Sequence, residues 1–232
     1  MKRASPWLSL ACAALAAAGC ASSPRETAYD PPIDPARFVA AIDNPYFPLA
    51  PGTTCRFRST DDEGDAEVTV TVTPSTRVVM GVTCVVVHDF LTRNGKIVED
   101  TFDWYAQDRE GNVWYFGEDT KEYERGRVST AGSWEAGVRG ARPGIVMMAH
   151  PKVGDSYRQE YLAGSAEDMS ETLALGETVT VPAGTFTNCI RTREWTPLEP
   201  GVAEQKTFAP GVGVVLTVQV EGGEEREELI GR

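Results

Sequence analysis

Four carboxylates on one stretch of the chain are the side chains best placed to do chemistry. Residues 96–124 read as a long β-hairpin, because two runs rich in aromatic and β-branched residues flank a Glu110-Gly111 turn. A two-residue turn there fixes every cross-strand pair further out along the hairpin. Four acids then share one face: Glu99 lies opposite Glu122, and Asp103 lies opposite Glu118. Carboxylate oxygens are the hard ligands that Ca²⁺ prefers, so a calcium site is one hypothesis for this face.

Two other interpretations of the acidic face stay open. Like charges directly opposite one another destabilise a sheet, so the acids are either paired with a cation or solvated. A solvated face would be neutralised by nearby basic residues, namely Lys121, Arg125 or Arg93. The pair Asp103 and Glu118 also has the residue types of a glycosidase, with aromatic residues beside it at Tyr105, Trp114 and Phe116.

The opposite face of the same hairpin is mostly apolar. It carries Val98, Phe102, Trp104 and Ala106 on the first strand. We expect this face to look toward the core, with the Trp104 ring lying over Gly117, which has no side chain.

Recognisable catalytic motifs are lacking elsewhere in the sequence. It has no Gly-x-Ser-x-Gly elbow, no zinc-type histidine pair and no phosphate-binding glycine loop. The two histidines, His88 in a predicted strand and His150 after Met147-Met148, are interpreted as ordinary structural residues. A soft copper site at His150 is the rarer alternative.

The first twenty residues predict a lipid anchor. Lys2 and Arg3 precede an apolar run, which ends in Ala17-Ala18-Gly19-Cys20. This segment resembles the lipobox of bacterial lipoproteins, which implies a signal peptide over residues 1–19 and a lipid on the Cys20 sulfur. Residues 20–38 are then expected to be a flexible tether, and residues 39–232 a single domain. Because residue 21 is alanine and not aspartate, the resemblance implies that the lipid anchor lies in the outer membrane. The membrane is then a partner of the protein through this anchor.

The charge of the chain limits its partners. The formal net charge is −12, with 22 basic and 34 acidic residues, and cleavage of a signal containing Lys2 and Arg3 makes it more negative. Such a chain is not expected to bind nucleic acid or to adhere by charge to anionic lipid headgroups.

Three cysteines remain after the lipidated one. Cys55, Cys84 and Cys189 would lie in a compartment that permits disulfides. At most one bridge forms among three, and Cys55–Cys84 is the predicted pair, with buried free thiols as the alternative.

The predicted fold is all-β: a single curved antiparallel sheet or open half-barrel with a long lid loop. Val68, Val70 and Val72 alternate with threonines, as in a half-buried strand, and no apolar period of 3.6 residues is sustained. Between Arg125 and Gly154 the pattern breaks into a segment rich in glycine, serine and alanine. It contains Trp134, Met147 and Met148, which are expected to form a ligand-binding lid.

Two turn motifs carry a resemblance over the span from Asn44 onward. VPAGTF at residues 181–186 and APGVG at residues 209–213 look like a family of uncharacterised bacterial secreted proteins and lipoproteins. The resemblance implies a strongly curved sheet similar to the half-barrels of the lipoprotein carriers LolA and LolB.

Three functions follow from these patterns. The first is a non-catalytic envelope lipoprotein whose half-barrel holds a hydrophobic, lipid-like ligand or a protein partner. The second is a structural envelope module stabilised by Ca²⁺. The third, ranked last, is a hydrolase that uses the acidic pair.

Overall fold

The computed structural model describes residues 29–232, and almost all of its regular structure is β-strand. A 3-10 helix, η1, spans Pro35–Arg37. The strands are β1 Phe38–Val39, β2 Thr54–Asp61, β3 Gly64–Val79, β4 Val82–Arg93, β5 Lys96–Asp108, β6 Val113–Glu124, β7 Arg127–Ser129, β8 Trp134–Glu135, β9 Arg142–Met147, β10 Ser156–Arg158, β11 Glu160–Tyr161, β12 Met169–Val181, β13 Gly184–Trp195, β14 Ala203–Ala209, β15 Gly213–Glu221 and β16 Arg226–Gly231. Within residues 29–232, no helix is both long and apolar enough to span a bilayer.

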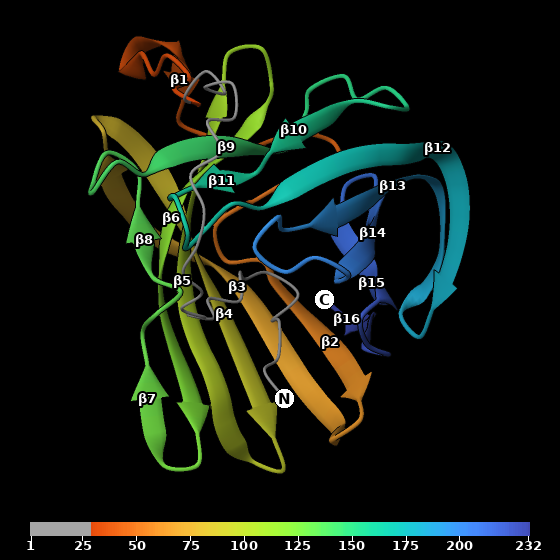
Figure 1. The fold of residues 1–232 in the computed structure, drawn as a ribbon. Helices are drawn as coiled ribbons and strands as arrows, with labels where there is room; N and C mark the ends of the chain where they lie inside the picture. Colours follow the sequence, from red (N-terminus) through yellow and green to blue (C-terminus); the bar gives the residue numbers. More distant parts are fainter. Residues whose placement is uncertain (1–28) are drawn as a thin grey trace, which may run out of the picture.

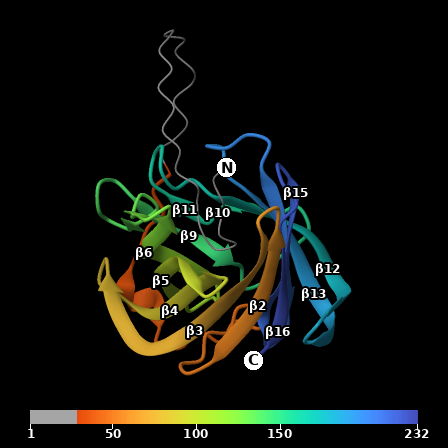
Figure 2. The same ribbon diagram turned by 90° about the horizontal axis from the view of Figure 1, so that it is seen from below.

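The strands form one antiparallel sheet that curves into a nearly closed barrel. Thirteen strands follow one another in the order β10-β12-β13-β14-β15-β16-β2-β3-β4-β5-β6-β9-β11. Figure 1 shows β2 to β7 on one side and β12 to β16 on the other, and Figure 2 shows both groups curving around one interior. The open seam lies between the two ends of this order, where Gln159 joins β10 directly to β11. The predicted all-β, single curved sheet is confirmed.

The interior face is identified from β3. Val68, Val70 and Val72 point inward and are at most 9% exposed, as their alternation predicts, while the intervening threonines point outward. Paired residues on neighbouring strands share a face, so the register extends this inner face around the barrel.

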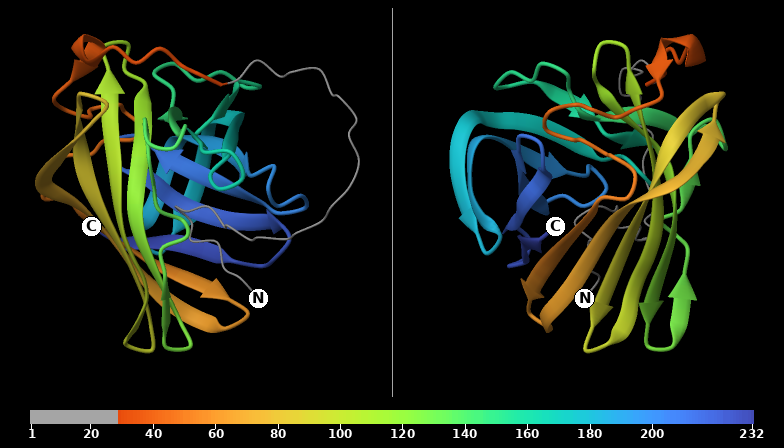
Figure 3. Two further views of the ribbon diagram at one scale, coloured as in Figure 1. Left: turned by 60° about the vertical axis from the view of Figure 1, so that its left-hand side comes forward. Right: turned by 180° about the vertical axis from the view of Figure 1, so that it is seen from behind.

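One end of the barrel is closed by an apolar plug from the N-terminal segment, which crosses the strand ends in Figure 3. Phe47 is 4% exposed, and its ring centroid lies 5.4 Å from that of Tyr105 and 6.3 Å from that of Phe208. Tyr29 donates a hydrogen bond to the carbonyl of Pro143, so the last part of the predicted tether, from Tyr29 on, lies against the barrel.

In the central hairpin, the strand pairs far from the turn are as predicted, but the turn itself differs from the prediction. Glu99 pairs with Glu122 and Asp103 with Glu118, as predicted. The turn, however, is formed by three residues, because the amide of Asp108 bonds to the carbonyl of Asn112. A register shift between Asp103 and Tyr105 compensates for the extra residue and restores the predicted pairs.

The prediction of which hairpin face looks into the barrel was wrong for the part away from the turn, although Trp104 of the apolar face is buried at 4% exposure. The acidic face looks into the barrel, where Asp103 and Glu118 are each 1% exposed and Glu99 is 6% exposed. Val98 and Phe102 lie on the outer face and are only partly buried. The reason lies in the closure of the sheet: β5 and β6 curve so that the polar side becomes concave, and hydrogen bonds among interior side chains replace contact with water.

The segment from Arg125 to Gly154 continues the sheet, whereas we had expected a lid loop without strands. β7, β8 and β9 all pair with β6, each along part of its length. Trp134 and Met147 are buried at 5% and 0% exposure, and Met148 is half-buried. These residues therefore belong to the wall of the barrel.

Candidate functional site

An open pocket of about 290 Å³ lies beside β6, which pairs with β5 on one side and with the short strand β8 on the other. Its walls combine apolar and charged side chains: Arg77, Trp104, Glu118, Asp119, Ser133, Trp134, Glu135, Val138, Arg139 and Leu162. It brings together Glu118 and Trp134, which were predicted as parts of two separate sites.

Gly117 allows this pocket to form. Its φ of +131° lies in a region that residues with side chains rarely adopt, and a Cβ atom there would collide with the backbone oxygen of Trp134. The same Cβ would lie 3.1 Å from Cε3 of Trp104, so the Trp104 ring rests against Gly117 as predicted. The glycine lets β8 approach β6 and places Trp134 beside Glu118.

Two of the lining residues each carry a buried polar atom that has no partner within the described part of the chain. Trp134 Nε1, a hydrogen-bond donor, and Glu118 Oε1 both lack one. Their residues are paired across β6 and β8, so the two side chains lie on one face. Leaving such groups unsatisfied costs about 1–3 kcal/mol each, which favours a ligand that satisfies them.

Behind the pocket, Tyr115 links the two acids. Its hydroxyl lies 2.6 Å from Oδ1 of Asp103 and 3.1 Å from Oε2 of Glu118. A phenol has one proton to donate, so both contacts are hydrogen bonds only when one carboxyl is protonated and donates to the phenol oxygen.

The electrostatics agree with a shared proton. Burial raises the pKa of Asp103 to about 7, although the hydrogen bond from Tyr115 opposes the shift. Burial and the neighbouring Asp103 raise the pKa of Glu118 well above its usual value. The distance between the two carboxyl oxygens that bond to Tyr115 is at most the sum of the two hydrogen-bond lengths. A separation of that order is also found between the two carboxyls of retaining glycosidases, but here the Tyr115 hydroxyl occupies the space between the oxygens, where a scissile bond would have to lie.

The outer side of the pocket is held by an arginine. The Arg77 guanidinium lies 3.9 Å from the centroid of a Trp104 ring and donates a 2.5 Å hydrogen bond to Glu135. Through these two contacts, Arg77 fixes the position of the Trp104 ring relative to Glu135 at the edge of the pocket.

The predicted calcium site is not assembled by these acids. Among residues 29–232, no group of three or more histidine, cysteine, aspartate or glutamate side chains is arranged to hold a metal ion. Glu99 accepts a hydrogen bond from Thr101, and Glu122 is only partly buried, further along the hairpin. Arg93, one of the basic residues expected to neutralise the acidic face, binds Asp61 with two hydrogen bonds and Glu63 with one.

The predicted disulfide is not formed. Cys55, Cys84 and Cys189 are all free thiols in the structure. The register explains why, since Cys55 lies level with Val70 and Asp89, five residues along β4 from Cys84. That offset alone is about 17 Å, far beyond the reach of a disulfide.

The two histidines have structural surroundings. His88 bonds to Asp100 at 2.8 Å and stacks on Phe102 with ring centroids 4.4 Å apart. His150 is exposed.

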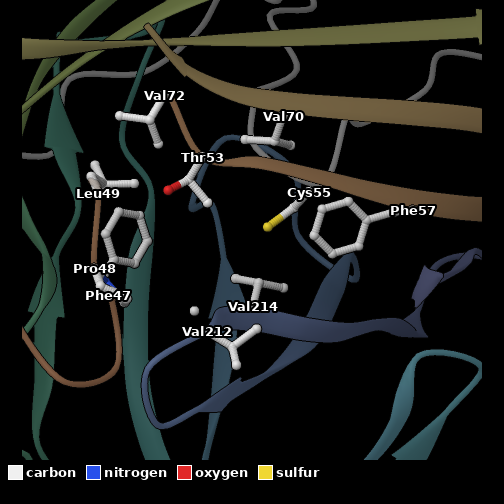
Figure 4. Close-up of a pocket in the computed structure, with 11 residues that line it drawn as sticks. Phe47, Pro48, Leu49, Thr53, Cys55, Phe57, Val70, Val72, Val212 and Val214 are labelled. Atoms are coloured by element: carbon white, nitrogen blue, oxygen red, sulfur yellow. The ribbon is translucent and has the colours of Figure 1, made fainter. Parts of the chain in front are cut away.

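A second, smaller pocket lies at the plugged end of the barrel. It has a volume of about 40 Å³ and an apolar lining that includes Phe47, Leu49, Phe57, Val70 and Val214, with Cys55 in its wall (Figure 4). It has room for a few carbon atoms only.

Sequence reasoning missed the polar residues that the later strands contribute to the interior. Register places Thr192, Lys206, Thr217 and Glu227 side by side on the inner face of β13 to β16. In each strand these residues are two positions from other inner-facing residues, and this alternation is visible in the sequence. It did not identify them as interior residues, because the alternation does not show which face of a strand is inside the barrel.

Comparison with known proteins yields one structural likeness. No protein-family model matches the chain, and no curated protein matches it. Among solved structures, the chain is similar to a candidate lipoprotein from Parabacteroides distasonis ATCC 8503. The alignment covers 80% of this chain and 96% of that one, with 15% identity and a TM-score of 0.45. A likeness at this level says nothing about the function of this chain, and the resemblance to LolA and LolB stays a prediction.

Proposed function

We propose that this chain is a lipid-anchored envelope protein whose barrel binds a small amphiphilic ligand in the pocket between Trp104 and Trp134. The anchor is supported by the Ala17-Ala18-Gly19-Cys20 sequence, which lies outside the described residues. One observation supports the binding site above all others: two residues that line the pocket, Trp134 and Glu118, carry a buried indole N–H and a buried carboxyl oxygen that have no partner in residues 29–232.

The chemistry of the pocket defines the class of ligand. Trp104, Trp134, Val138 and Leu162 offer apolar surface, so part of the ligand is apolar. The Trp134 N–H requires an acceptor, and Glu118, which burial favours in its neutral form, exchanges hydrogen bonds with a hydroxyl or amide. A volume of about 290 Å³ suits one ring or a short chain with a polar head, near the lower limit of ligand pockets. The predicted lipid-like ligand is retained in this narrower form.

The ligand is tested on full-length protein purified from its own membranes. Small molecules released by denaturation are identified by mass spectrometry, and one is expected at close to one equivalent per chain. Val138→Trp fills the pocket from an exposed position, since Val138 is 48% exposed, and is expected to abolish the signal without unfolding the barrel. A wild-type protein that carries no small molecule contradicts the proposal.

Removal of the indole donor tests the polar contact. Trp134→Phe keeps most of the aromatic surface but loses the N–H, so the affinity for the identified ligand is expected to fall about 3- to 10-fold, the effect of one hydrogen bond. Trp195→Phe is the matched control, because Trp195 lies on β13 and does not line the pocket. Equal losses in both variants would show that the effect is not local.

The lipid anchor is tested in cells by metabolic labelling with palmitate. The wild-type protein is expected to be labelled and to sediment with membranes, because a multiply acylated cysteine is a firm anchor. Cys20→Ser is expected to lose both properties, whereas Cys55→Ser keeps them. If the wild-type protein is not labelled, the proposal of a lipid anchor is wrong, whereas the proposal of a ligand pocket is unaffected.

A further inference from the structure

Buried acids outnumber buried cations in the described part of the barrel. Seven buried acids face it from strands around the barrel, namely Asp89, Glu99, Asp103, Glu118, Glu160, Glu194 and Glu227. Two cations in the described residues are buried: Lys206 lies among these acids, and Arg93 binds Asp61 and Glu63. Isolated buried charges are costly, so such an excess is balanced either by protons or by a further cation.

Glu227 is the most isolated of these acids. Its residue is 0% exposed, and neither carboxyl oxygen has a hydrogen-bond partner among residues 29–232. Its cross-strand neighbours do not satisfy it: Ser59 donates to Glu225 at 2.7 Å, and the hydroxyl of Thr217 has no partner either. Three polar atoms therefore meet at one place on the inner wall without a protein partner.

Asp89 adds a fourth such atom from another strand. It is 5% exposed, and its Oδ2 has no partner within the described residues. Burial and repulsion by Glu99, Asp103 and Glu227 raise the pKa of Asp89 well above its usual value, and the positive charge of Lys206 opposes this shift. The same causes raise the pKa of Glu227, whose other charged neighbours are Glu225 and Glu204.

Lys206 does not remove this excess. Its Nζ lies 2.7 Å from Oε2 of Glu194 and 2.9 Å from Oε1 of Glu204. Two carboxylates already outweigh its single charge on that side of the interior.

Apolar surface adjoins the unpartnered carboxyls. Asp89 is paired with Val70, which lines the pocket of about 40 Å³ at the plugged end, and Phe57 of the same pocket is paired with Leu229, two residues from Glu227 (Figure 4). A cation that carries a short alkyl chain would fit this combination of carboxyls and apolar wall.

We propose that the barrel interior binds a primary alkylammonium ion, with its N–H donors directed at Glu227, Asp89 and Thr217. An ammonium group offers three donors to oxygen acceptors that come from three strands, β4, β15 and β16. A divalent metal fits less well, because no group of three ligating side chains within residues 29–232 is arranged around one point. This site shares no residue with the proposed Trp134 pocket and does not depend on it.

Calorimetric titration of the full chain with n-propylamine tests this site. Saturable binding and a rise in melting temperature are expected. Glu227→Gln and Asp89→Asn preserve shape but remove charge, and each is expected to weaken n-propylamine binding about tenfold, the effect of one charged hydrogen bond. Glu228→Gln is the control, since Glu228 is the next residue, points outward and contacts Arg58 and Arg226.

Proton release gives a second readout that a merely structural role would not produce. Carboxyls that are neutral in the empty barrel ionise when the cation binds, so the heat of binding should depend on the ionisation enthalpy of the buffer. Absence of n-propylamine binding, unchanged binding by Glu227→Gln and Asp89→Asn, or competition by Ca²⁺ at equal concentration would each overturn the proposal. Val138→Trp should leave n-propylamine binding intact, which separates this site from the other pocket.

Discussion

Lys206→Met is expected to destabilise the protein by about 3–5 kcal/mol at slightly alkaline pH, the usual effect of removing one partner from a buried ion pair. Burial alone lowers the pKa of Lys206, but Glu194 and Glu204 outweigh it and raise the pKa above its usual value. The lysine therefore stays charged in the interior, and its removal leaves two carboxyls facing one another. Denaturant unfolding followed by circular dichroism measures the loss.

The loss in Lys206→Met should shrink at acid pH. Burial raises the pKa of Glu204 to about 7 even with Lys206 present, so without the lysine this carboxyl takes up a proton readily. Lys96→Met is the control, because Lys96 is exposed at the β4–β5 turn, and a change within about 0.5 kcal/mol is expected. A Lys206→Met protein as stable as wild type near pH 8 would mean that water reaches these carboxyls.

The free energy of unfolding is expected to fall as the pH rises from about 4 to about 7. The folded-state pKa of Asp103 is about 7, above its ordinary value of 3.8, so the folded protein binds more protons than the unfolded chain within this window. The stabilisation is complete below the unfolded pKa and is lost as the pH passes the folded one. For Asp103 it amounts to something on the order of 4 kcal/mol, a large part of the stability of a typical domain.

Isosteric variants isolate this pH effect. Asp103→Asn and Glu118→Gln remove the titrating groups at the Tyr115 contact, so each is expected to flatten the pH dependence and to be more stable than wild type near pH 8. Asp119→Asn is the control, since Asp119 is the exposed neighbour of Glu118 on the outer face of β6. Wild-type stability that is constant or rising between pH 5 and pH 8 would contradict the expectation.

Local structure could be predicted because it depends on neighbouring residues. The Asn94-Gly95 turn is an example: both residues have positive φ, which asparagine and glycine tolerate best, and Arg93 pairs with Lys96 across them. VPAGTF and APGVG likewise contain turns, with Val181 paired to Gly184 and Ala209 paired to Gly213. The alternating valines of β3 identified its inner face correctly.

The candidate site was predicted only in part. Asp103 was correctly set opposite Glu118, but their environment was not foreseen, and Trp134 was assigned to a lid. The predicted two-residue turn would set Tyr115 opposite Ala106 on the apolar face, but Tyr115 lies on the acidic face, because one extra residue in the turn moves every side chain before the bulge by one register position. Cross-strand spacing alone does not reveal such a compensated shift.

The sequence by itself determined the strands, most of their turns and the pairing of the acids, because these follow from side-chain alternation and backbone preference over a few residues. The tertiary structure alone decided which side of each strand is concave. Closure of the sheet turns the acidic side of β5 and β6 inward, opposite Lys206 and Glu227 from strands about a hundred residues further along the chain. Burial then changes the chemistry of these acids, since a carboxyl removed from water keeps its proton or requires a cation.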